Sequence, residues 1–110
     1  MPGTDVLMVY TTFPDEQSAK RITRELVELK LAACANIFCG MTSIYEWKGE
    51  VMEEGEVGVL LKTVRSRFVE LSKELCARHP YETPVVVGLD AALVEERYLA
   101  WLETQTSRKE

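Results

Sequence analysis

The alternation of apolar and polar positions predicts short strands and amphipathic helices along the chain. A run of strand-forming residues within 5–12, centred on Val6 to Tyr10, stops before Pro14 and predicts a buried strand. Asp15 then stands at a helix N-cap position. Beyond it, apolar residues recur at three- and four-residue steps, at Ala19, Ile22, Leu26 and Leu29. This spacing predicts a first helix of about four turns.

The middle of the chain has the pattern of a long β-hairpin. Residues 31–38 lead into strand-like composition at 42–47, and alternation resumes between Val51 and Val64. Lys48-Gly49 separates the two runs, and Gly49 is suited to a turn that needs a positive φ. We therefore predict an antiparallel hairpin with its tip at Lys48-Gly49.

The last third predicts a helix, a strand and another helix. Ser66 is the expected cap of the second helix, which must end before Pro80. One face of that helix is marked by Phe68, Leu71, Leu75 and Cys76. Residues 85–89 predict a strand that is apolar on both faces, as expected of a covered or interface position. The segment 95–105 predicts a docking helix with one apolar side at Val94, Tyr98, Trp101 and Leu102.

The order of these elements is typical of the split βαβ plan of ferredoxin-like folds. Right-handed crossovers place both main helices on one face of a four-stranded antiparallel sheet, giving an α+β fold with an extra C-terminal helix. The long hairpin and the second, apolar sheet face then need a cover, and we expect other copies of the chain to supply it. The 110 residues are expected to form one domain, 1–110.

Composition narrows the function classes. With 46% hydrophobic and 28% charged residues, the chain is typical of a folded domain. The net charge of −5 is unfavourable for nucleic-acid binding, which needs a basic surface. No run approaches the roughly 18 apolar residues of a membrane span, and the first residues lack the basic segment of a signal peptide. We expect a cytoplasmic protein with neither a nucleic-acid nor a membrane partner.

The single histidine of the chain is the first candidate for chemistry. His79 lies in the run Arg78-His79-Pro80-Tyr81-Glu82-Thr83-Pro84, where the prolines hold the backbone extended at a helix exit. A rigid connection of this kind often presents functional side chains. The alternative is that His79 only caps the helix end, where positive charge is favoured by the helix dipole.

Cysteine usage gives little indication of an enzyme. Cys34, Cys39 and Cys76 form no CxxC pair, so we expect reduced, buried side chains rather than disulfides or a zinc site. A nucleophilic Cys34 would need a cationic neighbour such as Lys62 or His79. Neither a nucleophile elbow nor a P-loop, GxGxxG or HExxH motif is present in the sequence, and we predict no catalytic residues.

Several separate blocks make the sequence resemble the CutA family of divalent-cation tolerance proteins, from about Val6 to Leu102. The blocks are PDE at 14–16, LAACANI at 31–37, TSIYEWKG at 42–49, VGVLLKT at 57–63, HPYETP at 79–84 and YLAWL at 98–102. The resemblance implies a ferredoxin-like subunit, a cytoplasmic homotrimer and a role in divalent metal-ion tolerance or response, copper included, by binding rather than catalysis.

The same resemblance shows departures at the family's copper ligands. A cysteine near the end of the first strand and two adjacent histidines correspond here to Thr11, Arg78 and His79. A hydroxyl and a guanidinium are poor replacements for the soft sulfur and imidazole donors that copper prefers. Val85 and Glu50 also replace a glutamate and a lysine that are common in the family, which changes the local charge.

Three candidate sites follow from the residues. A divalent metal ion, copper in the first place, would use His79, Glu82 and Cys34. A hard cation would use the hairpin glutamates, although those charges are better explained as solubilising an exposed edge. The alternative function is a ligand-sensing trimer without a physiological metal, whose subunit cleft holds a small anion or nucleotide-like ligand. Its expected ligand-binding residues are Trp47, Lys62, His79, Tyr81 and Glu82.

Overall fold

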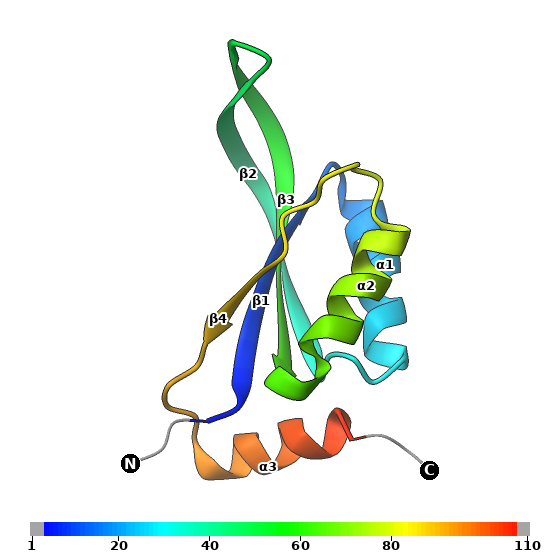
Figure 1. Ribbon diagram of the computed structural model, residues 1–110, viewed down its shortest axis with the longest axis vertical. Helices are drawn as coiled ribbons and strands as arrows, with labels where there is room; N and C mark the ends of the chain where they lie inside the picture. Colours follow the sequence, from blue (N-terminus) through cyan, green and yellow to red (C-terminus); the bar gives the residue numbers. More distant parts are fainter. Residues whose placement is uncertain (1–3, 108–110) are drawn as a thin grey trace.

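The structure is a computed structural model that describes residues 4–107, and all its strands belong to one antiparallel sheet (Figure 1). Its elements are β1 Val6–Phe13, α1 Glu16–Glu28, β2 Cys34–Trp47, β3 Glu50–Val64, the 3₁₀ turn η1 Arg65–Arg67, α2 Phe68–Arg78, β4 Val87–Asp90 and α3 Glu96–Gln105. The strand order is β2-β3-β1-β4. The first and last strands, β1 and β4, are therefore neighbours, and β2 and β4 are the edge strands. The predicted α+β, ferredoxin-like fold is confirmed.

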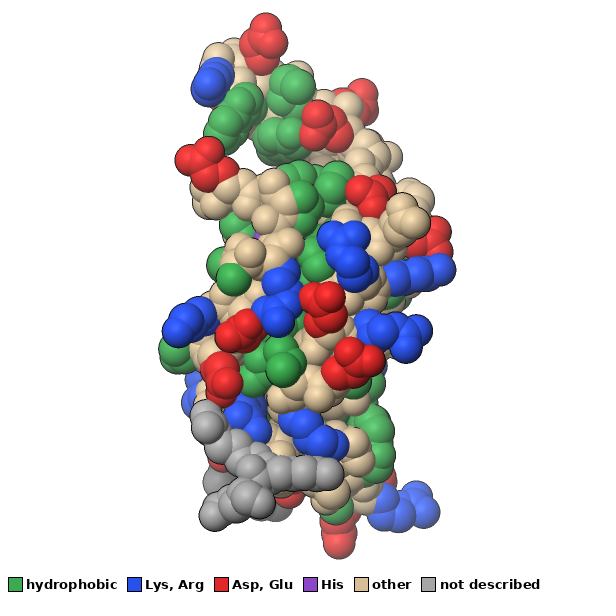
Figure 2. Space-filling view, turned by 90° about the vertical axis from the view of Figure 1, so that its right-hand side faces the viewer, with side chains coloured by type: hydrophobic (Ala, Val, Ile, Leu, Met, Phe, Trp, Pro, Cys, Tyr) green, Lys and Arg blue, Asp and Glu red, His purple; other side chains and the backbone are tan. Residues whose placement is uncertain are grey.

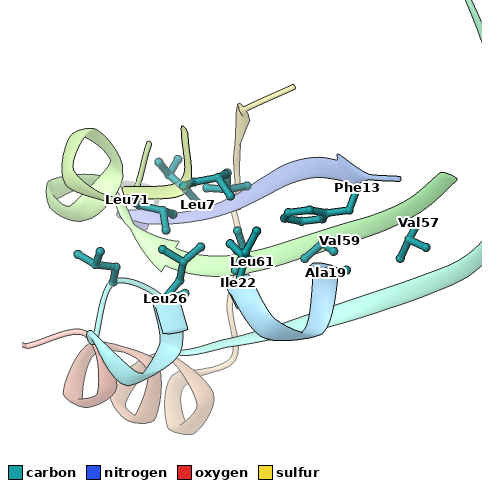
Figure 3. Packing of buried hydrophobic residues seen from close by; sticks show 13 residues of the cluster. Leu7, Phe13, Ala19, Ile22, Leu26, Val57, Val59, Leu61 and Leu71 are labelled. Atoms are coloured by element: carbon teal, nitrogen blue, oxygen red, sulfur yellow. The ribbon is translucent and has the colours of Figure 1, made fainter. Parts of the chain in front are cut away.

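Helices α1 and α2 cover one face of the sheet and enclose the main core (Figures 1 and 3). Alternate residues of β1 and β3 point toward the helices because side chains of a strand alternate between faces. The buried members of this core include Leu7, Val9, Phe13, Ile22, Leu26, Val59, Leu61, Leu71 and Leu75. At about 1.5–3 kcal/mol for each large buried side chain, this layer is the main source of stability.

Helix α3 closes the end of the sheet opposite the hairpin tip (Figure 1). Its Leu102 is fully buried against Val6 and Ala33, in a second, smaller apolar cluster. Arg67, which is buried, donates from Nε to the carbonyl of Thr106 at 2.8 Å and ties the end of α3 to the start of α2. The predicted docking helix is therefore confirmed, with Glu95 as its N-cap.

The face of the sheet away from α1 and α2, called the open face below, is only partly covered. Cross-strand pairing puts Met8 beside Leu89 and Tyr10 beside Val87, and continues through β3 to β2. Its residues are Met8, Tyr10, Cys34, Asn36, Phe38, Leu60, Lys62, Val87 and Leu89. Phe38, Val87 and Leu89 expose about half of their surface. A strongly apolar face thus remains accessible on the single chain.

Beyond the core, β2 and β3 continue as a two-stranded arm that projects from the domain (Figure 1). A β-bulge between Phe38 and Met41, with Gly40 at φ 79°, marks the base of the arm. The arm exposes Ile44 (66%), Trp47 (60%) and Val51 (74%). Figure 2 views the helical side, where acidic and basic side chains intermix, while apolar side chains gather on the arm. The helical side is therefore suited to solvent, and the arm is suited to a protein contact.

Three local predictions were wrong. Ser66 does not cap α2, because residues 65–67 tighten into a 3₁₀ turn and Arg67 occupies the N-cap without a side-chain bond. Leu29 is 48% exposed because it is the C-cap residue of α1, where the helix has already ended. The last strand begins at Val87 rather than Val85, since its pairing with β1 starts with Val87 opposite Tyr10.

The cysteines also differ from expectation. Cys39 and Cys76 are exposed and Cys34 is half-buried, so none belongs to the core that was predicted for them. Cys39 lies in the bulge, Cys76 lies on the outer side of α2 next to buried Leu75, and Cys34 lies on the open face. All three are free thiols, as predicted.

The hairpin tip provides a test of backbone strain. Lys48 and Gly49 both have positive φ, 50° and 84°, which is the pattern of a type I′ turn. Replacing Gly49 by alanine should cost about 1 kcal/mol at φ 84°. We expect the amides of Trp47 and Val51 to exchange hydrogen about fivefold faster, because the arm opens locally before the domain unfolds.

The matched control is Gly55→Ala on the same arm. Gly55 has no atom within 4 Å of an added Cβ and no left-handed φ, so its replacement should leave exchange unchanged or slower. Equal acceleration by both substitutions would show that the turn is not strained.

Candidate functional site

His79 lies between the end of β1 and the crossover that leads from α2 to β4. Its ring stacks on Phe13 with centroids 4.5 Å apart and lies 4.9 Å from the ring of Tyr81. The side chain is buried, with 8% of its surface exposed. The proline on its C-terminal side fixes the extended backbone at φ −72° and ψ 139°, as predicted.

Both ring nitrogens of His79 are engaged in hydrogen bonds. The backbone N–H of Tyr81 donates to Nδ1 at 3.0 Å, so Nδ1 carries a lone pair. Nε2 lies 2.7 Å from the carbonyl oxygen of Thr12, which only accepts, so Nε2 carries the proton. The ring is therefore a neutral imidazole in a defined tautomer. It fastens the crossover to β1.

The surroundings of His79 disfavour its charged form. Burial lowers the pKa of His79 below its usual 6.5, although the Thr12 carbonyl and the nearby Glu56 act in the opposite direction. Tyr81 donates its hydroxyl hydrogen to Glu56 Oε2 at 2.5 Å. Burial, followed by this carboxylate, raises the pKa of Tyr81. The crossover is thus bonded to β1 through His79 and to β3, at the base of the arm, through Tyr81.

A second group of polar side chains, called the Lys62 cluster below, lies on the open face. It consists of Cys34, Asn36, Lys62 and Tyr98. Cys34 pairs directly with Lys62 across β2 and β3, and Asn36 is two residues further along the same face of β2. The Lys62 ammonium donates to Asn36 Oδ1. Tyr98 reaches the cluster from α3, with its hydroxyl 3.3 Å from the Cys34 sulfur.

The aromatic wall of this cluster comes from α3. Tyr98 and Trp101 lie with ring centroids 5.6 Å apart and are 39% and 42% exposed. The hydrogen bond with Cys34, followed by burial, raises the pKa of Tyr98 to about 12. The phenol therefore keeps its proton at neutral pH and acts as a hydrogen-bonding group rather than a base.

Comparison with known proteins identifies the family of the chain. The family model of the CutA1 divalent ion tolerance protein matches residues 7–105. The chain belongs to the CutA family. It is 44% identical over 99 residues to the divalent-cation tolerance protein CutA of Thermus thermophilus, covering 90% of this chain and 96% of that protein. It is 38% identical to the CutA protein of Pyrococcus horikoshii, covering 94% of this chain and all of that one.

Solved structures agree with this assignment. The CutA of Xylella fastidiosa superposes with a TM-score of 0.92 at 34% identity, covering 94% of this chain and 100% of the other. The family resemblance seen in the sequence is therefore confirmed, and with it a general association with divalent-cation tolerance.

The CutA-type fold of this chain does not assemble the predicted metal ligands. His79 bonds to Thr12, which is opposite Gly58, whereas Cys34 is opposite Lys62. These positions are four residues apart on β3, about 13 Å. Glu82 is exposed on the crossover. Within residues 4–107, no group of three or more His, Cys, Asp or Glu side chains is arranged to hold a metal ion.

The positions of the family's copper ligands are likewise unsuited to a metal. Thr11 is completely buried, and its hydroxyl has no hydrogen-bond partner among the described residues. Arg78 donates from Nε to Glu25 at 2.9 Å and also pairs with Glu74, on the outside of the helical layer. These three positions offer a hydroxyl, a paired cation and a fully bonded imidazole. They do not fit copper.

The predicted ligand-binding residues do not form one site, because they lie in separate parts of the structure. Trp47 is at the arm tip, where Lys48 Nζ lies 5.7 Å from its ring centroid. Twelve positions of β3 separate its partner Glu50 from Lys62, about 40 Å. His79 and Tyr81 bond the crossover to β1 and β3, and Glu82 next to them is exposed. Only Lys62 belongs to an open polar cluster, and its neighbours were not predicted.

The hairpin glutamates are used in local bonds or exposed. Glu54 accepts a hydrogen bond from the Tyr45 hydroxyl at 2.5 Å, and Glu56 accepts one from Tyr81. Glu46, Glu50 and Glu53 are exposed. This arrangement favours the solubilising interpretation over a site for a hard cation.

Asn36 and Tyr98 were missed by sequence reasoning. The alternation Cys34-Ala35-Asn36 indicates that the two polar residues share a strand face, but their pairing with Lys62 depends on the hairpin register. A bulge at Cys39-Gly40 shifts that register by one residue. The approach of Tyr98 depends on where α3 docks, which periodicity alone does not determine.

His79 predicts a defined pH dependence of stability. Since the folded protein has a lower His79 pKa than the unfolded chain, the unfolded chain binds a proton first as pH falls. Stability should be full above pH 6.5 and decline below it. Urea unfolding at intervals from pH 8 to pH 5 measures this decline.

The control for this prediction is His79→Gln, which removes the only histidine. It retains a donor for Thr12 but loses the ring, so we expect a loss of roughly 1–3 kcal/mol at pH 8. Its stability should not decline between pH 6.5 and 5.5. An identical decline in wild type and variant would contradict the assignment to His79.

Proposed function

We propose that this chain is a cytoplasmic homotrimer that contributes to tolerance of divalent cations by binding rather than by catalysis, without a copper site at Thr11, Arg78 and His79. Membership of the CutA family supports the tolerance role. The observation that carries the assembly is the open face, where Phe38 on edge strand β2 and Val87 and Leu89 on edge strand β4 stay half-exposed. An apolar face of this kind is typical of a protein interface.

The sheet edges support a closed ring of subunits. β2 and β4 are the two edge strands, and each has an unpaired edge in the single chain. Because these edges differ in length and side chains, contact of one with the other is heterologous, and heterologous contacts form rings when the rotation closes. The apolar arm, with Ile44, Trp47 and Val51 exposed, extends the surface available to a neighbouring copy.

The remaining parts of the proposal rest on the thiols and on Tyr98. Exposed free Cys39 and Cys76 suit a reducing compartment such as the cytoplasm. Cys34 is hydrogen-bonded to Tyr98, and with its pKa raised to about 12 this phenol is a poor base for activating a thiol. Binding is thus better supported than catalysis. Within the described residues, no helix is long and apolar enough to span a bilayer.

The Lys62 cluster favours a second candidate function, a trimer that senses a small ligand without a physiological metal. A cation, an amide, a phenol and a thiol meet on the open face, beside two aromatic rings. Such convergent polar groups with apolar walls are typical of small-molecule sites.

The assembly is tested by the mass of the protein in solution. Light scattering after gel filtration should give three times the 12.5 kDa subunit mass. Val87→Lys places a charge on the open face and should reduce the mass toward that of the monomer, because an unpaired charge in an apolar interface is costly.

Val69→Lys is the matched control, since Val69 is 79% exposed on α2, on the helical side. It should leave the mass unchanged. A monomeric wild type, or an equal effect of both substitutions, would contradict the proposed interface.

The role of His79 in copper binding is tested by calorimetric titration with Cu²⁺. Because both ring nitrogens are bonded, coordination would require breaking the contact with Thr12 or with Tyr81. We expect wild type and His79→Gln to give the same isotherm. Loss of a binding event in the variant would show that the ring leaves its pocket to bind copper.

A further inference from the structure

Lys62 is a half-buried cation without a carboxylate partner in the described part of the chain. The ion pairs there join Lys20 to Glu16, Arg65 to Asp90, Arg67 to Glu70, Arg78 to Glu25 and Glu74, and Arg97 to Glu95. Among the described residues, the single hydrogen-bond partner of the Lys62 ammonium is the neutral Asn36. Of the described lysines and arginines that form none of these ion pairs, Lys62 is the one that lies on the open face.

The bond from Lys62 also orients Asn36. Since Oδ1 accepts from the ammonium, the NH₂ group of the amide keeps two donors for another partner. The ammonium has three N–H donors and uses one of them on Asn36. Two side chains on neighbouring strands β2 and β3, on the same face of the sheet, therefore offer several donors to one acceptor group.

Charge and shape narrow the class of acceptor. One cation with neutral donors matches a monoanion, whereas a dianionic phosphate would remain undercompensated on a protein of net charge −5. A carboxylate has two oxygens that accept from neighbouring donors. The rings of Tyr98 and Trp101, both partly exposed, supply an apolar surface next to these donors.

We propose that the Lys62 cluster binds a small organic monocarboxylate, with the carboxylate at Lys62 and Asn36 and the hydrocarbon part against Tyr98 and Trp101. This inference rests on the second candidate function and names its ligand class. The Cys34 thiol, bonded to the Tyr98 hydroxyl, borders the ligand.

Calorimetric titration with sodium benzoate and with sodium acetate at pH 7.5 tests the inference. We expect saturable binding of both, tighter for benzoate because its ring buries more apolar surface. Lys62→Ala should weaken benzoate binding at least tenfold. Asn36→Asp should weaken it as much, since the new carboxylate neutralises Lys62 directly.

Lys73→Ala is the matched control, because Lys73 is an exposed lysine of α2 on the helical side. It removes the same charge and should leave benzoate binding unchanged. An equal loss in this control would reduce the effect to net charge and would overturn the site.

A second measurement follows Cys34 in a Cys39→Ser, Cys76→Ser background, which leaves one thiol. Saturating benzoate should slow the alkylation of Cys34 by iodoacetamide at least threefold, and Lys62→Ala should abolish this protection. Absence of protection together with absence of heat would overturn the proposal, even if the trimer mass is as expected.

Two further outcomes separate this inference from the proposed functions. Phosphate binding that depends on Lys62 would overturn the monocarboxylate class and preserve a ligand-binding function. If the wild type binds none of the added anions and the mass of the assembly in solution falls on Lys62→Ala, a neighbouring copy neutralises Lys62. The inference would then be wrong and the assembly proposal would stand.

Discussion

Burial of one face of the sheet under α1 and α2 is the constraint on which the rest of the structure depends. Phe13, Leu61 and the other inward side chains of β1 and β3 are buried in the cluster that these two helices enclose. With only two helices of 13 and 11 residues, the chain cannot cover both faces of its sheet, and α3 reaches only one end. The exposed face and the projecting arm follow from this shortage of cover, and both are therefore available for contacts with other molecules.

His79 illustrates how a sequence signature divides between structure and chemistry. Its neutral ring stacks on Phe13 and bonds to Thr12 and Tyr81. These contacts, which hold the crossover, use the proton on Nε2 and the lone pair on Nδ1. A metal-binding histidine needs one nitrogen free. In this chain the stabilising role and a ligand role compete for the same atoms, and the paired Arg78 and buried Thr11 provide no further donors.

Most of the fold was predictable because its signals are local. The turn at Lys48-Gly49, the cap at Asp15 and the periodicity of α1 depend on a few neighbouring residues. The errors arose where tertiary contacts decide. Buried Arg67 occupies the N-cap of α2, where Ser66 had been expected. The exposure of Cys34 depends on which face of the sheet the helices cover.

The site was harder to predict for the same reason. Lys62 was predicted as a ligand-binding residue, yet its neighbours come from a strand pairing shifted by a bulge and from the docking of α3. His79 and Lys62 were both predicted ligand-binding residues. The His79 ring bonds to Thr12, which is opposite Gly58, and Gly58 is four residues from Lys62 on β3. Long-range register, which the sequence does not specify position by position, decides which residues form a site.

The position of Lys62 on the open face couples the two proposals. A second copy that covers Val87 and Leu89 also removes water from the surroundings of the nearby ammonium, and an unpaired charge becomes more costly as water is removed. A bound monoanion offsets this cost, so it stabilises the assembled state more than the separate subunits. By linkage, assembly must then raise the affinity for the anion by the same factor. The single unpaired cation of the open face is thus placed where ligand binding and assembly depend on each other.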